Sequence, residues 1–316
     1  MVVCVARNYT HSALFLNPKS LGWKVLPMRH TNTDAPMKQL FLLLSAALLF
    51  SPLHTAQAGE ANHGALQLDS QSACSNAVGD SDGMTATEAL RGREISLVSW
   101  NIEKGSNSGW RRDLRRLTKD AHLVLLQEAV LSEEMLPGRQ EDFRFWSFSP
   151  GYQTAETGSG VMTLSRYAPG ILCSLQHQEP WLNTPKAASV TRYRLAESSQ
   201  DLLLVNVHQI NFAFGLADFA RQLGDLAAVM AQHDGPMILS GDFNTWKLSR
   251  WNVLKEITAN LGLDSVTFSP DYRKKFMGNP LDHVFVRGLN VTASYTVQVK
   301  SSDHNPLILK LTLEEV

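Results

Sequence analysis

The sequence is poor in cysteine and has no excess of either charge. It contains 3 cysteines in 316 residues, too few for a disulfide-stapled miniprotein. The 29 Lys plus Arg residues nearly balance 30 Asp plus Glu residues, so no global positive field draws in a polyanion. With 44% apolar residues and no collagen-like or polytopic membrane pattern, what remains is a globular protein with a sizeable core.

The main apolar run near the N-terminus is short for a membrane span. It follows Lys38, extends from Leu40 to Phe50, and is followed by Ala56 and Ala58 in A-x-A spacing. A basic start, a short apolar run and small exit residues are typical of a secretory signal peptide. Cleavage after Ala58 is therefore predicted, with an uncleaved anchor or a buried arm as the alternative.

Residues 1–36 precede the basic start that should open a signal peptide. We therefore interpret residues 1–58 as a misannotated leader plus the signal peptide, with translation beginning at Met37 or Met28. Export would place the mature protein in the periplasm or outside the cell. A leader without function would leave it in the cytoplasm.

Residues 59–93 are rich in Ser, Ala, Gly and Asp, and are predicted to be a flexible linker before a folded domain at 94–316. Cys74 lies in this linker and Cys173 in an apolar strand candidate. Export would permit a disulfide between them. The sequence nevertheless favours unpaired cysteines, and no C-x-x-C or Cys/His spacing indicates zinc or redox chemistry.

From Glu94 onward, short runs rich in Val, Ile, Leu and aromatic residues indicate many strands. Helices are predicted at 110–119, 216–232 and 250–261 only. Many strands with few helices, in β-α-β order at both ends, predict an α/β fold of two packed sheets with helices outside.

Polar residues stand where several of these apolar strands end. Asn101, Glu128 and His208 each close a strand candidate, and Asp242 closes another with Asn244 two residues later. Taken singly, Asn and Asp at strand ends are usually turn formers. The repetition at four strand ends is harder to explain by turns alone.

Two later strands instead begin with such residues. Asp282 precedes the strand HVFV, and Asp303 with His304 precedes PLILKL. If these strands run antiparallel to the others, their starts share one sheet edge with the other strands' ends. Carboxylates, histidines and amides would then converge on one cleft, which suits a hard cation and general acid/base chemistry on phosphate.

In order and approximate spacing, these motifs resemble those of the endonuclease/exonuclease/phosphatase superfamily. The motifs are WNIEKG, LLQEA, NVHQIN, GDFN, LDHVFV and SDHNP, within about residues 94–313. The segments DAHLVLLQEA, SGVMTLS and PLDHVFVRGLNV are similar to its bacterial YafD-type branch. The resemblance implies a DNase-I-like, four-layer α-β-β-α sandwich of two mixed sheets flanked by helices, with residues 94–316 as the catalytic domain.

The resemblance also implies a site for Mg²⁺ or Mn²⁺. Glu128 would be the principal carboxylate ligand, Asn101 would help to hold metal or phosphate, and Asp303 would be a second metal ligand. His208 would act at the phosphate or leaving group as a donor or general acid. Asn211, three residues later, would bind phosphate.

The remaining roles concern the attacking water and the scissile phosphate. Asp242 would orient or deprotonate the water, while Asn244 would hold Asp242 or donate to phosphoryl oxygens. His304 would contact the scissile phosphate, and Asp282 would hold its ring. Alternation along the strand turns the neighbouring His283 away from Asp282, so we interpret it as a packing residue.

The implied activity is a metal-dependent phosphodiester hydrolase, with a nuclease acting on DNA or RNA as first choice. A lipid or small-molecule phosphoesterase, of sphingomyelinase or inositol-phosphatase type, is the alternative, because loops set the substrate on such folds. An inactive binding scaffold is a third hypothesis. Of the basic runs, Arg273–Lys275 is the better candidate for a phosphate-backbone clamp, since it precedes Asp282 closely. The sequence predicts no stable membrane span and leaves the oligomeric state open.

Overall fold

The computed structural model describes residues 65–80, 88–135, 143–153, 157–180, 184–196, 198–213 and 215–314. The predicted leader and signal peptide at residues 1–58 lie outside this part of the chain. Within it, no helix combines the length and apolar character needed to cross a membrane.

The larger of the two packed sheets has eight strands. Its order is β1 (Leu66–Leu68), β7 (Ile171–Gln178), β8 (Pro185–Leu195), β9 (Asp201–His208), β10 (Met237–Asp242), β14 (Asp282–Arg287) and β11 (Asp264–Ser265), with β2 (Ala89–Leu90) beside β8. Strands β9 and β10 are parallel, and β14 runs antiparallel to β10. The end of β10 and the start of β14 therefore share one edge, as predicted.

The smaller sheet places the first and last strands of residues 94–313, β3 and β16, side by side. Its order is β15 (Leu289–Thr296), β16 (Leu307–Leu313), β3 (Glu94–Asn101), β4 (Leu123–Val130), β6 (Gly158–Ser165) and β5 (Phe145–Gln153). Strands β3 and β4 are parallel, and β16 is antiparallel to β3. A small hairpin of β12 (Lys275–Phe276) and β13 (Asn279–Pro280) stands apart from both sheets.

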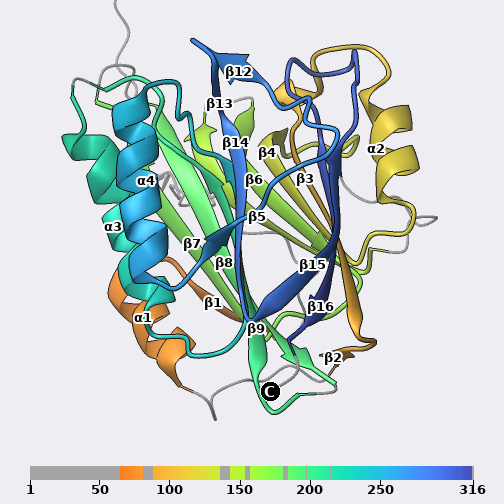
Figure 1. Cartoon of the computed structure of the whole chain (residues 1–316), viewed down its shortest axis with the longest axis vertical. Coiled ribbons are helices and arrows are strands. Elements are labelled where there is room, and N and C mark those ends of the chain that lie inside the picture. Colours follow the sequence, from red (N-terminus) through yellow and green to blue (C-terminus); the bar gives the residue numbers. More distant parts are fainter. Residues whose placement is uncertain are drawn as a thin grey trace, which may run out of the picture. The chain divides into compact units, whose positions relative to one another are not determined.

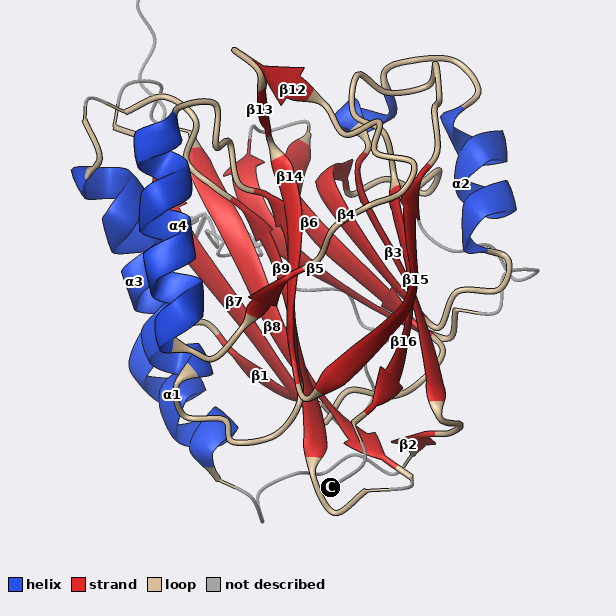
Figure 2. Ribbon diagram, in the orientation of Figure 1, coloured by secondary structure: helices blue, strands red, loops and turns tan. Residues whose placement is uncertain are grey.

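Helices cover the outer face of each sheet, which gives the predicted four layers (Figures 1 and 2). Helices α1 (Gln71–Gly79), α3 (Ala217–Met230) and α4 (Leu248–Asn260) pack on the larger sheet, and α2 (Trp110–Thr118) packs on the smaller one. A short 3₁₀ turn, η1 (Glu103–Gly105), follows β3. The three predicted helices are present, whereas α1 was not predicted.

Alternation along the strands sorts the side chains into three apolar cores. In β3, Ile95 and Leu97 face the second sheet, whereas Val98 and Trp100 pack outward in the core beneath α2. In β9, Leu202 and Leu204 likewise face inward. Because the side-chain period of a strand is two, the same inward rows continue to Asn101 and His208 at the strand ends.

The segment before residue 94 corrects two predictions. Residues 65–80, expected in a linker, form β1 and α1, and the buried Arg192 donates hydrogen bonds to the carbonyls of Ala77, Val78 and Asp80 at the end of α1. Cys74 and Cys173, expected to be unpaired, form a disulfide with Cα atoms 5.8 Å apart. Small and polar residues dominate this segment, so its sequence hides the single face that packs on β7.

The disulfide closes a separation of 99 residues and should stabilise the fold. We expect Cys173→Ser to lower the free energy of unfolding by about 2–4 kcal/mol, measured by urea denaturation. Wild-type protein reduced with dithiothreitol should have the same free energy of unfolding as the variant. The double variant Cys74→Ser/Cys173→Ser should be as stable as the single variant. Equal stability with and without reductant would contradict the pairing.

Candidate active site

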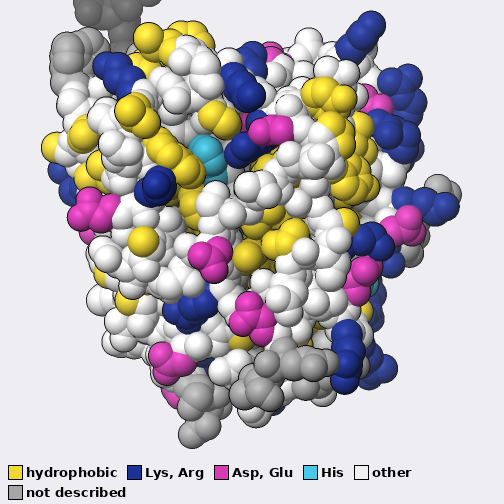
Figure 3. Space-filling model, viewed as in Figure 1, with side chains coloured by type: hydrophobic (Ala, Val, Ile, Leu, Met, Phe, Trp, Pro, Cys, Tyr) yellow, Lys and Arg dark blue, Asp and Glu magenta, His cyan; other side chains and the backbone are white. Residues whose placement is uncertain are grey.

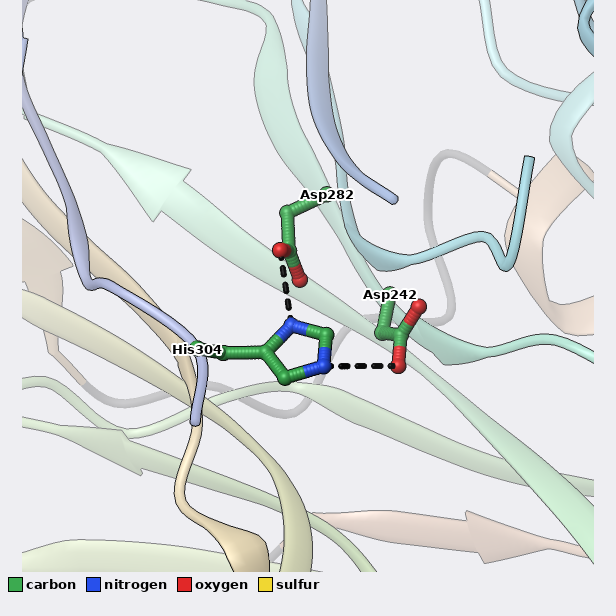
Figure 4. A group of neighbouring side chains, drawn as sticks. All are labelled: Asp242, Asp282 and His304. Carbon is green, nitrogen blue, oxygen red and sulfur yellow. Dashed lines mark hydrogen bonds and ion pairs between the residues drawn. The ribbon is translucent and has the colours of Figure 1, made fainter. Parts of the chain in front are cut away.

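The polar ends of the inward-facing rows meet in one cleft of about 640 Å³. Every predicted site residue except Asp282 lines it: Asn101, Glu128, His208, Asn211, Asp242, Asn244, Asp303 and His304. Asp282 lies behind His304, where it contacts the imidazole (Figure 4). The predicted site residues therefore lie together at one edge of the sheets. The role of each residue stays a prediction.

Glu128 reaches the cleft because β4 is irregular at this point. Gln127 faces inward, so strict alternation would turn Glu128 outward. The pairing of β4 with β6 shifts between Leu126 and Ala129, and Glu128 has φ 51°, in the left-handed region. A bulge of this kind re-aims a side chain at some backbone cost. It turns the carboxylate into the cleft, 3.8 Å from Lys104 Nζ.

Asp242 is a buried carboxylate held on both oxygens. The Asn101 side-chain amide donates to Oδ2 and the Asn244 backbone N–H donates to Oδ1, both at 3.0 Å. Burial, opposed by the charge of His304, raises the pKa of Asp242 to about 6. The side chain of Asn244 does not hold Asp242, because it donates to the carbonyl of Gln209. A carboxylate with this pKa can take up a proton near neutral pH.

His304 lies between two carboxylates. Its Nδ1 is 2.8 Å from Asp282 Oδ2 and its Nε2 is 4.0 Å from Asp242 Oδ2 (Figure 4). Burial alone would lower the pKa of His304, but Asp282, Asp242 and Asp303 together raise it to about 10. The indole of Trp100 donates to the backbone carbonyl of His304 and fixes this loop.

Among the described residues, Asp242, Asp282 and His304 form a group whose ligand atoms lie within 4.8 Å of one another, close enough to hold a metal ion. In that group, however, His304 already shares a hydrogen bond with Asp282 and carries positive charge. The predicted ligands Asn101, Glu128 and Asp303 offer side-chain oxygens at the cleft, the donors that Mg²⁺ and Mn²⁺ prefer. The donor set therefore fits a hard cation.

Two charged residues that the sequence did not single out position the loops of the site. Arg250 is buried and donates to the carbonyls of Ile210, Asn211 and Asn244, which joins the loops after β9 and β10. Burial lowers the pKa of Arg250 to about 10. Glu179, also buried, accepts the backbone N–H of Asn211. No local pattern marks either residue, since both act on segments distant in sequence.

Lys186 is a third residue that sequence reasoning missed. Its Nζ lies 3.0 Å from Nε2 of His208. That same ring nitrogen is 3.8 Å from Glu128 Oε1 and 3.8 Å from Asp242 Oδ2. Burial and then the charge of Lys186 lower the pKa of His208 well below its usual value.

The basic run before Asp282 does not act as one clamp. Lys274 lines the cleft and contacts Asp303 at 3.1 Å. Arg273 instead pairs with Asp271 and donates to the carbonyl of Asp282. His283 points away from Asp282, as predicted, and stacks on Trp251.

Gly241 allows β9 and β10 to approach closely just before Asp242. A Cβ at this position would lie 1.9 Å from the carbonyl oxygen of Val207. We expect Gly241→Ala to lower the free energy of unfolding by about 1–3 kcal/mol in urea denaturation. Gly224→Ala, in α3 with nothing within 4 Å of its Cβ, should instead stabilise by up to about 1 kcal/mol. Equal effects would show that the close approach is absent.

The His304 pair predicts how stability depends on pH in metal-free protein. Since its folded-state pKa of about 10 exceeds the reference 6.5, its contribution is complete below pH 6.5 and disappears as pH rises toward 10. Asp282→Asn should flatten this decline, measured as urea midpoints across that range. Asp225→Asn, which removes the carboxylate charge beside His177 elsewhere in the protein, should leave the decline in place. Parallel curves for wild type and Asp282→Asn would contradict the pairing.

Structural comparison finds the same fold in solved proteins. An endonuclease/exonuclease/phosphatase structure from Beutenbergia cavernae aligns with TM-score 0.54 at 15% identity, over 70% of this chain and 72% of that one. The human Nocturnin catalytic domain with bound sulfate aligns with TM-score 0.53 at 16% identity, over 72% and 97%. At these identities the likeness concerns the fold alone.

Sequence comparison gives closer relatives. A UPF0294 protein of Photorhabdus laumondii is 38% identical over 216 residues, 68% of this chain and 83% of that protein. A UPF0294 protein of Vibrio vulnificus is 37% identical over 228 residues, 69% and 77%. The model of the Endonuclease/Exonuclease/phosphatase family matches residues 98–304, which contain every predicted site residue. The chain therefore belongs to the endonuclease/exonuclease/phosphatase family.

Proposed function

We propose that this chain is a divalent-metal-dependent phosphodiester hydrolase, with nucleic acid as its first candidate substrate. Family membership supports a metal-dependent phosphoesterase. The observation that carries the proposal is the buried Asp242, which Asn101 and Asn244 hold in a cleft beside His304. Such a carboxylate has the position and the pKa of a base for the attacking water.

The other residues of the cleft supply positive charge and orientation. His304, held by Asp282, would contact a nonbridging oxygen of the scissile phosphate and stabilise the charge that develops there. Asn211 has its side-chain oxygen fixed by the indole of Trp246, so its amide N–H groups remain to donate to phosphate. Water would lose its proton to Asp242 as its oxygen bonds to phosphorus.

A bound Mg²⁺ or Mn²⁺ would supply Lewis-acid stabilisation of the phosphoryl oxygens. Glu128, Asn101 and Asp303 are the residues proposed to hold it, because they present oxygens to the same cleft. Lys104 lies near Glu128 and Lys274 near Asp303, so positive charge flanks both carboxylates. The two lysines can also meet an anionic substrate at the mouth of the cleft.

Aromatic side chains beside these groups favour a nucleic acid. Phe212, Trp246 and Phe276 line the cleft, and the rings of Trp246 and Phe276 contact each other edge to face. Aromatic faces next to lysines are suited to bases stacked along a phosphate backbone. The nuclease proposal rests on this combination.

A lipid phosphodiester is the second candidate, because exposed apolar residues lie at the cleft or close in sequence to residues that line it. Phe212 and Phe276 line the cleft, Met277 follows Phe276, and Leu248 is two residues after Trp246. Phe212, Leu248, Phe276 and Met277 are 55%, 63%, 55% and 72% exposed, higher than any other large hydrophobic residue of the described chain. Hydrophobic and basic side chains occur together near the upper end of this face, where β12 and β13 lie (Figures 1 and 3). Such a rim also suits a membrane surface.

We further propose that the protein is exported, as the signal-peptide pattern suggests. The Cys74–Cys173 disulfide supports this location, because disulfides persist in oxidising compartments. Peptide mapping of the exported protein would test the predicted cleavage after Ala58.

The central test is a cleavage assay with the purified protein. Its substrates are plasmid DNA, single-stranded DNA, RNA, phospholipid vesicles and bis-p-nitrophenyl phosphate. Each substrate is assayed with Mg²⁺, Mn²⁺ or EDTA. We expect metal-dependent nicking of nucleic acid, with a loss of about 100-fold or more in Asp242→Asn. Glu128→Gln should lower activity and metal affinity together, because it removes a ligand charge.

The outcomes separate the candidates. Turnover of phospholipid but not of nucleic acid would favour a lipid phosphodiesterase. In that case the double variant Phe276→Ser/Met277→Ser should reduce the turnover. Turnover that survives EDTA and Glu128→Gln would contradict the metal assignment. No detectable turnover of any substrate would favour an inactive binding scaffold. Lys255→Gln, on exposed α4 surface, is the matched surface control.

A further inference from the structure

Lys186 contacts His208, a residue of the cleft, from a strand that carries no sequence motif. It lies near the start of β8, which runs antiparallel to β9 with Ala188 opposite Val207. The start of β8 therefore stands beside the end of β9, where His208 lies. The side chain of Lys186 is half-buried, and its ammonium nitrogen is 3.0 Å from Nε2 of His208.

The chemistry of this contact fixes the direction of the hydrogen bond. An ammonium group has donors only, so Nε2 of His208 must accept. A neutral imidazole that accepts at one nitrogen carries its proton on the other, which here is Nδ1.

This arrangement changes what His208 can do. Nε2 is the ring nitrogen that faces the site, since it lies 3.8 Å from oxygens of both Glu128 and Asp242. With that nitrogen accepting from Lys186, it has no proton to give to a leaving group. The general-acid role implied by the family resemblance therefore does not fit the geometry at Nε2.

We infer that Lys186 is a positioning residue that holds His208 as the neutral tautomer protonated on Nδ1, and that the positive charge on this side of the site belongs to Lys186. This inference rests on the proposed phosphodiester hydrolase for its catalytic consequence. When the P–O bond to the leaving group breaks, negative charge develops on the departing oxygen. A fixed ammonium nearby stabilises that charge without a protonated histidine.

The tautomer can be measured without any activity. In ¹⁵N-histidine NMR of the purified chain, the His208 signals are assigned by their loss in His208→Asn. We expect the pattern of a neutral ring with the proton on Nδ1 in wild type and in Lys186→Arg, which retains a donor. Lys186→Met should lose this pattern. A wild-type ring protonated on Nε2, or on both nitrogens, would overturn the inference.

Kinetics then test the charge on the leaving-group side. The substrates are a dinucleotide, whose leaving group is an alkoxide, and the p-nitrophenyl ester of the same nucleotide. Because p-nitrophenolate needs little stabilisation, Lys186→Met should lose about 100-fold on the dinucleotide and less than about tenfold on the ester. Lys255→Met is the control for loss of a surface lysine.

Each result decides the inference. Equal losses on both substrates would assign Lys186 a structural role and overturn the leaving-group part. Lys186→Arg, which like lysine has donors only and keeps the charge, should retain both the tautomer and most of the dinucleotide rate. If no diester is cleaved by any form, the proposed hydrolase fails, while the NMR result still decides the tautomer.

Discussion

A buried polar bridge between the two sheets holds the site together. Gln127 of the smaller sheet donates to Asn206 of the larger sheet at 2.8 Å, and Asn206 donates to the carbonyls of Leu126 and Met162. Both side chains are nearly inaccessible, so a shift of one sheet against the other would leave unpaired polar groups in the interior. Gln127 is next to Glu128 in sequence, and Asn206 is two residues before His208. The bridge therefore holds in place the strand ends that carry Glu128 and His208.

In the cleft above this bridge, several carboxylates lie close to positively charged side chains that are held at defined positions. Asp282 and Asp242 flank His304, Lys104 lies near Glu128, and Lys186 reaches the same region through His208. Like charges this close would repel one another if no cations separated them. The left-handed backbone conformation of Glu128 is unfavourable by itself and persists only when the surrounding structure holds it. Pairing with β6 and the polar bridge provide that support.

Much of the fold and most of the candidate site could be predicted from the sequence. Apolar runs that end in Asn101, His208 and Asp242 indicated a shared edge, because alternation continues each inward row to the strand end. The helices at the surface of the sandwich were also predictable from their periodicity. Helix α1 and the Cys74–Cys173 disulfide were not, because their polar and small residues resemble a linker and only contact with β7 reveals the packed face.

The identity of the polar groups and their order along the chain can be read from the sequence, since motif spacing and strand alternation are local properties of the chain. How those groups are arranged depends on the tertiary structure. The β4 bulge turns Glu128 inward, Arg250 ties two loops together, and Lys186 meets His208 from another strand. Each of these depends on contacts between segments distant in sequence, and such contacts leave no signature in the local pattern of residues.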